Sequence, residues 1–105
     1  MITMAANTWI FLGTTTGSTA YNLSNVEYKE LFVIPKYNQV DCTGIRITPL
    51  CENYNIFNGY TTTTPRCIQI RYSSSNSTIA IRHAYNESSS PTVYTNNMTM
   101  DIYYR

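Results

Sequence analysis

Residues 68–82 have the sequence IQIRYSSSNSTIAIR, and this stretch decides the fold class of the chain. Isoleucine occupies alternate positions in residues 68–71 and again in residues 79–82. Because successive side chains of a strand point to opposite faces, this alternation predicts two half-buried antiparallel strands. Residues 73–76 between them are serine or asparagine, a polar stretch short enough to close a hairpin.

Strand patterns recur along the rest of the chain. Residues 45–47 repeat the isoleucine alternation, and residues 98–104 place their apolar side chains on one face. Residues 28–34 form a continuous strand pattern, which we expect to end at Pro35 because proline has no backbone N–H for a sheet. Residues 9–12 are apolar throughout, which predicts a buried strand.

The composition favours strands throughout. Thr, Val, Ile, Tyr, Phe and Trp make up 45 of the 105 residues, whereas the good helix formers Ala, Leu, Glu, Lys, Met, Gln and Arg make up 26. Together these features predict an all-β chain, an antiparallel β-sandwich of about seven or eight short strands that is jelly-roll-like. A β-barrel is the alternative. We expect residues 9–105 to form this single domain, preceded by an N-terminal arm of residues 1–8.

The charge is close to neutral, and this limits the partners of the chain. Seven Lys and Arg residues are scattered along the sequence and offset by six Asp and Glu residues, for a net charge of +1. Since phosphate backbones require a basic patch, we expect no binding to nucleic acid. The sequence contains no apolar run of about 18 residues and no signal-peptide pattern, so we expect neither membrane insertion nor export by a signal of its own.

The hydrophobic core is expected to be thin. Leu, Ile, Val and Phe make up only 22 of the 105 residues, close to the level at which chains fail to bury enough apolar surface to fold. The ten tyrosines and Trp9 add large amphipathic side chains that can line the edge of a core. We therefore expect contacts between subunits to stabilise the domain.

The three cysteines, Cys42, Cys51 and Cys67, allow at most one intramolecular disulfide. We expect three buried free thiols in a reducing compartment, because a free cysteine behaves as a small apolar residue. A metal site made with His83 is the other interpretation, but the spacings contain no paired CxxC element. The sequence therefore predicts neither a metal nor a cofactor.

His83 is the only histidine, the side chain that most often serves as a general acid or base in catalysis. Its position has the same parity as Ile79 and Ile81, which predicts a structural imidazole that faces the core. Asp41 and Asp101 are the only aspartates, so residue types alone leave a Ser/His/Asp set open. No GxSxG sequence supports such a set, and we expect that the chain is not an enzyme.

Three aromatic residues, Tyr54, Phe57 and Tyr60, are the candidate contact residues. They lie in residues 53–64, a stretch of Asn and Thr that is expected to be a loop. Flat apolar rings among amide and hydroxyl groups provide the chemistry that a sugar needs. The alternative is that these rings pack against the domain itself or a sister subunit.

The two ends and the middle of the chain resemble small domains on the virion proteins of bacteriophages, at the tips of tail fibres, baseplates or head fibres. The similar stretches are residues 9–17 (WIFLGTTTG), 28–35 (YKELFVIP) and 102–105 (IYYR). The resemblance implies an exposed structural or adhesive β-sandwich, commonly trimeric, whose partners are other virion proteins. No binding residue is carried over, because the similar stretches are strand patterns.

The expected function is therefore that of a phage virion surface protein, at a fibre tip or as a decoration domain, assembled in the cytoplasm of the host bacterium. We expect a homo-oligomer, with a trimer favoured, that contacts glycans of the host surface. A domain without a shaft of its own is expected to attach to a separate virion protein, or to use residues 1–8 as an arm. The alternative is a stand-alone carbohydrate-binding module of bacterial origin.

Overall fold

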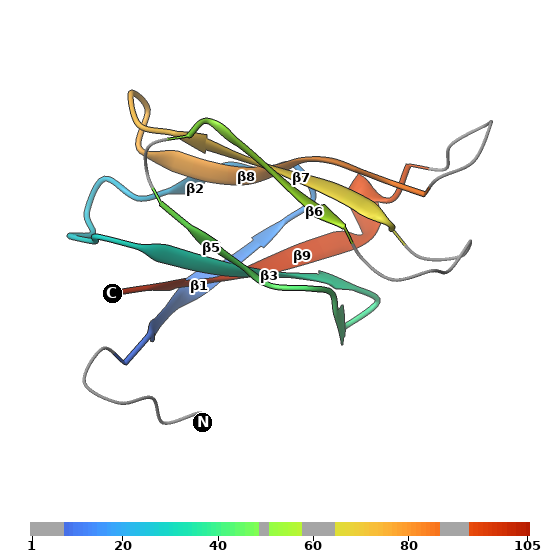
Figure 1. The fold of residues 1–105 in the computed structure, drawn as a ribbon, viewed down its shortest axis with the longest axis horizontal. Helices are drawn as coiled ribbons and strands as arrows, with labels where there is room; N and C mark the ends of the chain where they lie inside the picture. Colours follow the sequence, from blue (N-terminus) through green and yellow to red (C-terminus); the bar gives the residue numbers. More distant parts are fainter. Residues whose placement is uncertain (1–7, 49–50, 58–64, 87–92) are drawn as a thin grey trace.

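The computed structural model describes residues 8–48, 51–57, 65–86 and 93–105, which form two antiparallel β-sheets packed together (Figure 1). The expected all-β sandwich is confirmed, with nine strands where the sequence predicts about seven or eight. Within these ranges the only helix is a single 3-10 turn, η1 (Thr95–Asn97), and no helix is long and apolar enough to cross a membrane.

The first sheet contains β1 (Ile10–Thr16), β3 (Leu31–Tyr37), β4 (Val40–Asp41), β5 (Ile45–Ile47) and β9 (Met98–Tyr104). Strand β9 lies between β1 and β3, and both β4 and β5 pair with β3. The second sheet contains, in spatial order, β2 (Tyr21–Asn22), β8 (Thr78–Tyr85), β7 (Cys67–Ser73) and β6 (Asn53–Phe57). The predicted hairpin of residues 68–82 is therefore confirmed as the centre of the second sheet.

The core lies between the two sheets and uses alternate positions of each strand. Ile70 pairs with Ile81 across β7 and β8, and Val33 pairs with Ile102 across β3 and β9. All four side chains are fully buried. Burial of an aliphatic side chain of this size stabilises the fold by about 1.5–3 kcal/mol. Since these strands bury one face each, their other face points away from the core.

The prediction that Pro35 ends a strand is wrong, because Pro35 lies inside β3 opposite Met100. Its carbonyl oxygen accepts a hydrogen bond from the backbone N–H of Cys42 at 2.8 Å, on the side of β3 that faces away from β9. In an antiparallel strand the nitrogen of a residue points to the same side as its carbonyl. The missing N–H therefore removes no hydrogen bond to β9, and the strand continues through the proline.

The prediction that His83 faces the core is also wrong. The pairing of β7 with β8 shifts register, since Gln69 pairs with His83 but Ile70 pairs with Ile81. Arg82 is thus an extra residue, a β-bulge that interrupts the alternation of faces. As a result Arg82 and His83 are both exposed, and the strand turns inward again only at the next residue.

Candidate functional site

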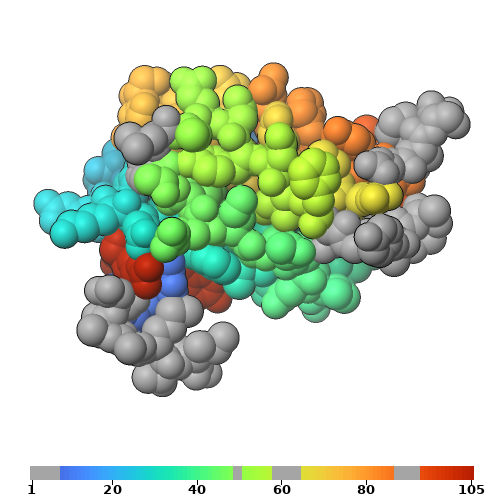
Figure 2. All heavy atoms as spheres, in the orientation of Figure 1, coloured from blue at the N-terminus to red at the C-terminus, as the bar shows by residue number. Residues whose placement is uncertain are grey.

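Two of the three candidate contact residues named from the sequence, Tyr54 and Phe57, lie in the edge strand β6, which is uncovered at the front of the molecule (Figure 2). The expected loop is a strand as far as Phe57. Tyr54 is half-buried against the core, and its hydroxyl donates a hydrogen bond to the carbonyl oxygen of Thr48. Phe57 is 66% exposed, and Tyr60 lies outside the described residues. Tyr54 and Phe57 stand three positions apart in a strand and therefore do not share a face, so their contact to a glycan or a subunit stays a prediction.

A larger group of aromatic side chains lies on the outer face of the first sheet. Tyr103 of β9 pairs with Phe11 of β1 on one side and with Phe32 of β3 on the other. The rings of Phe11 and Tyr103 lie 5.4 Å apart, and the ring of Trp9 lies 5.6 Å from that of Phe32. We call these four residues the aromatic face. Phe11 is 55% exposed and the other three are half-buried, so the group is open to solvent.

Charged side chains border the aromatic face at the end of the sheet. The guanidinium of Arg105 lies 4.1 Å from the centre of the Trp9 ring, a cation–π contact. Arg105 also forms an ion pair of 2.6 Å with Glu30, and Glu30 lies 3.6 Å from Arg46 of β5. The aromatic face and the ion pairs are therefore joined through Arg105.

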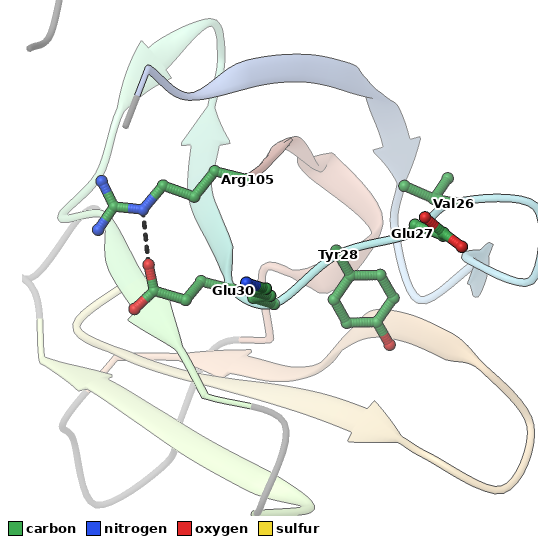
Figure 3. A pocket seen from close by; sticks show the side chains of 6 residues that line it. Val26, Glu27, Tyr28, Glu30 and Arg105 are labelled. Atoms are coloured by element: carbon green, nitrogen blue, oxygen red, sulfur yellow. Dashed lines mark hydrogen bonds and ion pairs between the residues drawn. The ribbon is translucent and has the colours of Figure 1, made fainter. Parts of the chain in front are cut away.

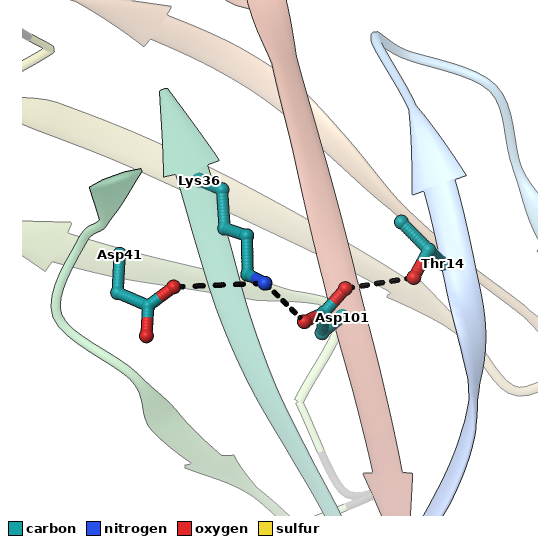
Figure 4. Close-up of polar contacts among 4 residues, drawn as sticks. All are labelled: Thr14, Lys36, Asp41 and Asp101. Atoms are coloured by element: carbon teal, nitrogen blue, oxygen red, sulfur yellow. Dashed lines mark hydrogen bonds and ion pairs between the residues drawn. The ribbon is translucent and has the colours of Figure 1, made fainter. Parts of the chain in front are cut away.

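A polar network occupies the other part of the same outer face and crosses four strands (Figure 4). The ammonium group of Lys36 lies 2.8 Å from one carboxylate oxygen of Asp101 and 3.7 Å from Asp41. The hydroxyl of Thr14 donates a 2.7 Å hydrogen bond to the other oxygen of Asp101. The hydrogen bond to Asp101 raises the pKa of Lys36. The outer face thus has an aromatic part and an ion-paired part.

An open cleft lies beside the aromatic face and shares Glu30 and Arg105 with its charged border (Figure 3). Tyr28 lines the cleft, and its hydroxyl shares a hydrogen bond with the hydroxyl of Tyr72 on the second sheet. Burial and this hydrogen bond raise the pKa of Tyr28 above its ordinary value. Tyr28 therefore acts as a neutral phenol that ties the two layers together.

The residues considered for catalysis do not meet. Asp41 and Asp101 lie together on the outer side of the first sheet, whereas His83 lies on the outer side of the second. These three residues therefore do not form a Ser/His/Asp set.

The cysteines differ in exposure, and all three are free thiols. Cys42 and Cys67 are buried, but the prediction that Cys51 is buried is wrong. Burial raises the pKa of the Cys42 thiol. Among the described residues, no group of three His, Cys, Asp or Glu side chains is arranged to hold a metal ion.

Sequence reasoning missed the aromatic face because residues 9–12 predict a buried strand. In the structure Ile10 is 51% and Phe11 is 55% exposed. The useful signal is the parity of Tyr103, which stands one position from the buried Ile102 and therefore faces outward. Its neighbours across the strands, however, depend on the register and cannot be read from the sequence.

Comparison with known proteins adds no relative: no family model, no curated protein and no solved structure matches this chain.

Proposed function

We propose that this chain is a structural domain of a bacteriophage virion surface, at a fibre tip or as a decoration domain, which assembles through its aromatic face. The observation that carries the proposal is the grouping of Trp9, Phe11, Phe32 and Tyr103 on one open sheet face. Aromatic residues and arginine are enriched in protein interfaces and supply most of their binding energy.

The charged border supports an interface at this face. Hot-spot residues of interfaces are surrounded by polar groups that exclude water from the centre. Here Glu30, Arg46 and Arg105 stand at the edge of the aromatic group and already form ion pairs with one another. Both arginines of this border therefore already have an acidic partner, Glu30, which they share.

The resemblance of residues 9–17, 28–35 and 102–105 to phage fibre and baseplate domains supports the virion surface as the location. Three free thiols agree with assembly in a reducing bacterial cytoplasm. The partners under this proposal are further copies of the chain, with a trimer favoured, and other virion proteins. The chain acts by binding and has no catalytic role.

Particle composition tests the proposal. Phage particles are purified from an infection in which the host also expresses the tagged chain, either unchanged or as the Phe11→Ser variant. The unchanged chain is expected to sediment with the particles, and Phe11→Ser is expected to be lost from them. A control, Val40→Ser, removes an apolar side chain that is 68% exposed but lies outside the aromatic face, and is expected to stay bound. An unchanged chain that never sediments with particles would contradict the location.

A stand-alone carbohydrate-binding module is the second candidate, and the exposed ring of Phe57 favours it. The Phe57 side chain is 66% exposed beside Asn55, whose carboxamide accepts a 3.1 Å hydrogen bond from Gln69. A ring next to amide groups can stack on a neutral sugar. This candidate predicts glycan binding that Phe57→Ala abolishes, in a chain that stays monomeric and never associates with particles.

A further inference from the structure

Charge is divided unequally between the two sheets. The strands of the second sheet contain Arg71, Arg82 and His83 but no Asp or Glu, and residues 53–86 as a whole contain no acidic residue. The first sheet, in contrast, contains Asp41 and Asp101 among its strands. The outer face of the second sheet is therefore cationic, although the chain as a whole is near neutral.

A shallow depression lies on this cationic face. Ala80 of β8 stands opposite Arg71 of β7, and it lines the depression together with Ala20. These short side chains leave room between the longer ones. Arg71 and Arg82 also line the depression, so two arginines border one hollow.

The two arginines are not used to hold the fold together. The cations that form ion pairs in the structure described above include Lys36, Arg46 and Arg105. Within the same ranges, the guanidinium groups of Arg71 and Arg82 have neither an ion pair nor a hydrogen bond. As far as the described residues show, both guanidinium groups can therefore donate hydrogen bonds to a ligand.

The β-bulge in β8 adds one more polar side chain, His83, to this outer face. Because Arg82 is the extra residue of the bulge, Arg82 and His83 point outward in succession. Bulges commonly redirect side chains next to functional sites. Arg82 has the parity of Ala80 and would face outward in a regular strand as well, whereas His83 would face the core.

We propose that this depression binds a carboxylate-bearing sugar of a host surface glycan. Arginine binds carboxylates through two parallel hydrogen bonds, and two arginines can hold one carboxylate from two sides. Ser18, Asn76 and Thr78 line the same hollow and offer hydroxyl and amide groups to the hydroxyls of the sugar ring. This site specifies the class of glycan that the proposed virion protein would contact. Only the origin of the glycan, the host surface, rests on the proposed function.

A nucleic acid fits this surface less well than an acidic sugar. Binding to a phosphate backbone uses many cations spread along a groove, whereas Arg71 and Arg82 share a single hollow. The lining hydroxyl and amide groups suit a polyhydroxylated ring. A carboxylate on such a ring matches both features at once.

A glycan array tests the proposal, with each carboxylate-bearing saccharide (sialyl- or glucuronyl-terminated) printed beside its neutral counterpart. The unchanged chain is expected to bind at least one acidic member more tightly than its neutral counterpart. Arg71→Ala and Arg82→Ala are each expected to weaken this binding about tenfold or more, because each removes a charged hydrogen bond. Lys29→Ala removes an exposed cation that does not line the depression, and this variant is expected to bind as the unchanged chain does.

Two control measurements distinguish a specific site from a misfolded variant and from general binding of anions. Thermal unfolding of each variant shows that loss of binding is not loss of fold, since both arginines are exposed. Binding of a single-stranded oligonucleotide is measured as well, to show whether the chain binds any polyanion. No preference for any acidic saccharide, equal binding to the oligonucleotide, or full binding by Arg82→Ala would each overturn the proposal. A chain that binds acidic saccharides yet never joins particles would contradict the virion location and uphold this site.

Discussion

Several individual side chains keep their protons more firmly in the fold than in the unfolded chain. The hydrogen bond to Asp101 raises the pKa of Lys36, and burial raises the pKa values of Tyr28 and Cys42. A group with a raised pKa stabilises the fold fully below its unfolded pKa, and it loses that contribution as the pH rises through the folded value. All three groups therefore lower the free energy of unfolding as the pH becomes alkaline.

We expect the free energy of unfolding, measured with urea at a series of pH values, to decline above about pH 9, the ordinary pKa of the Cys42 thiol. The decline is expected to steepen above the ordinary pKa of Lys36, 10.5. Asp101→Asn removes the cause of the Lys36 shift, so its profile is expected to be flatter in that upper range. Stability that rises between pH 9 and 11 would contradict this assignment.

Substitutions on the two faces of β8 are expected to lower the free energy of unfolding by very different amounts. Ile81 is fully buried, so Ile81→Ala is expected to lower the free energy of unfolding by about 2–5 kcal/mol. His83→Ala is expected to change it by no more than about 0.5 kcal/mol, because His83 is exposed beyond the bulge. Urea denaturation measures both values. Similar costs for the two variants would mean that His83 faces the core after all.

Strands with regular alternation could be predicted from the sequence, and those with irregular features could not. The isoleucines of β7 and β8 mark one face because each pair stands two positions apart. The bulge at Arg82 could not be predicted, because the extra residue follows the last isoleucine of the pattern and does not interrupt it. Strand β6 was missed because its outward positions, Asn53 and Asn55, are residues typical of loops.

The hairpin between β3 and β4 depends on an unusual backbone conformation. Asn38 and Gln39 have positive φ angles of 49° and 66°, as the two central residues of a type I′ turn do. Asparagine tolerates this conformation, whereas glutamine is disfavoured in it. Gln39→Gly is therefore expected to raise the free energy of unfolding by up to about 1 kcal/mol, and Asn38→Gly by less. Chemical denaturation measures the difference, and a destabilised Gln39→Gly would contradict the turn assignment.

At the scale of the whole molecule, the two outer faces have different chemistry. One carries the aromatic face and its ion pairs, and the other carries Arg71 and Arg82 beside a hollow. The sequence predicts that each sheet has one solvent-exposed face, because apolar and polar side chains alternate along its strands. It does not predict which side chains become neighbours there, since Trp9, Phe32 and Tyr103 come from distant parts of the chain.

The most direct test of the central claim, that the aromatic face is a contact surface, is the mass of the chain in solution by sedimentation velocity. The unchanged chain and Val40→Ser are expected to sediment above the 12.0 kDa of a single chain, and Phe11→Ser is expected to return to that value. Thermal unfolding of Phe11→Ser serves as the control for its fold. A 12.0 kDa monomer for the unchanged chain, or a Phe11→Ser variant that stays fully assembled, would contradict the account.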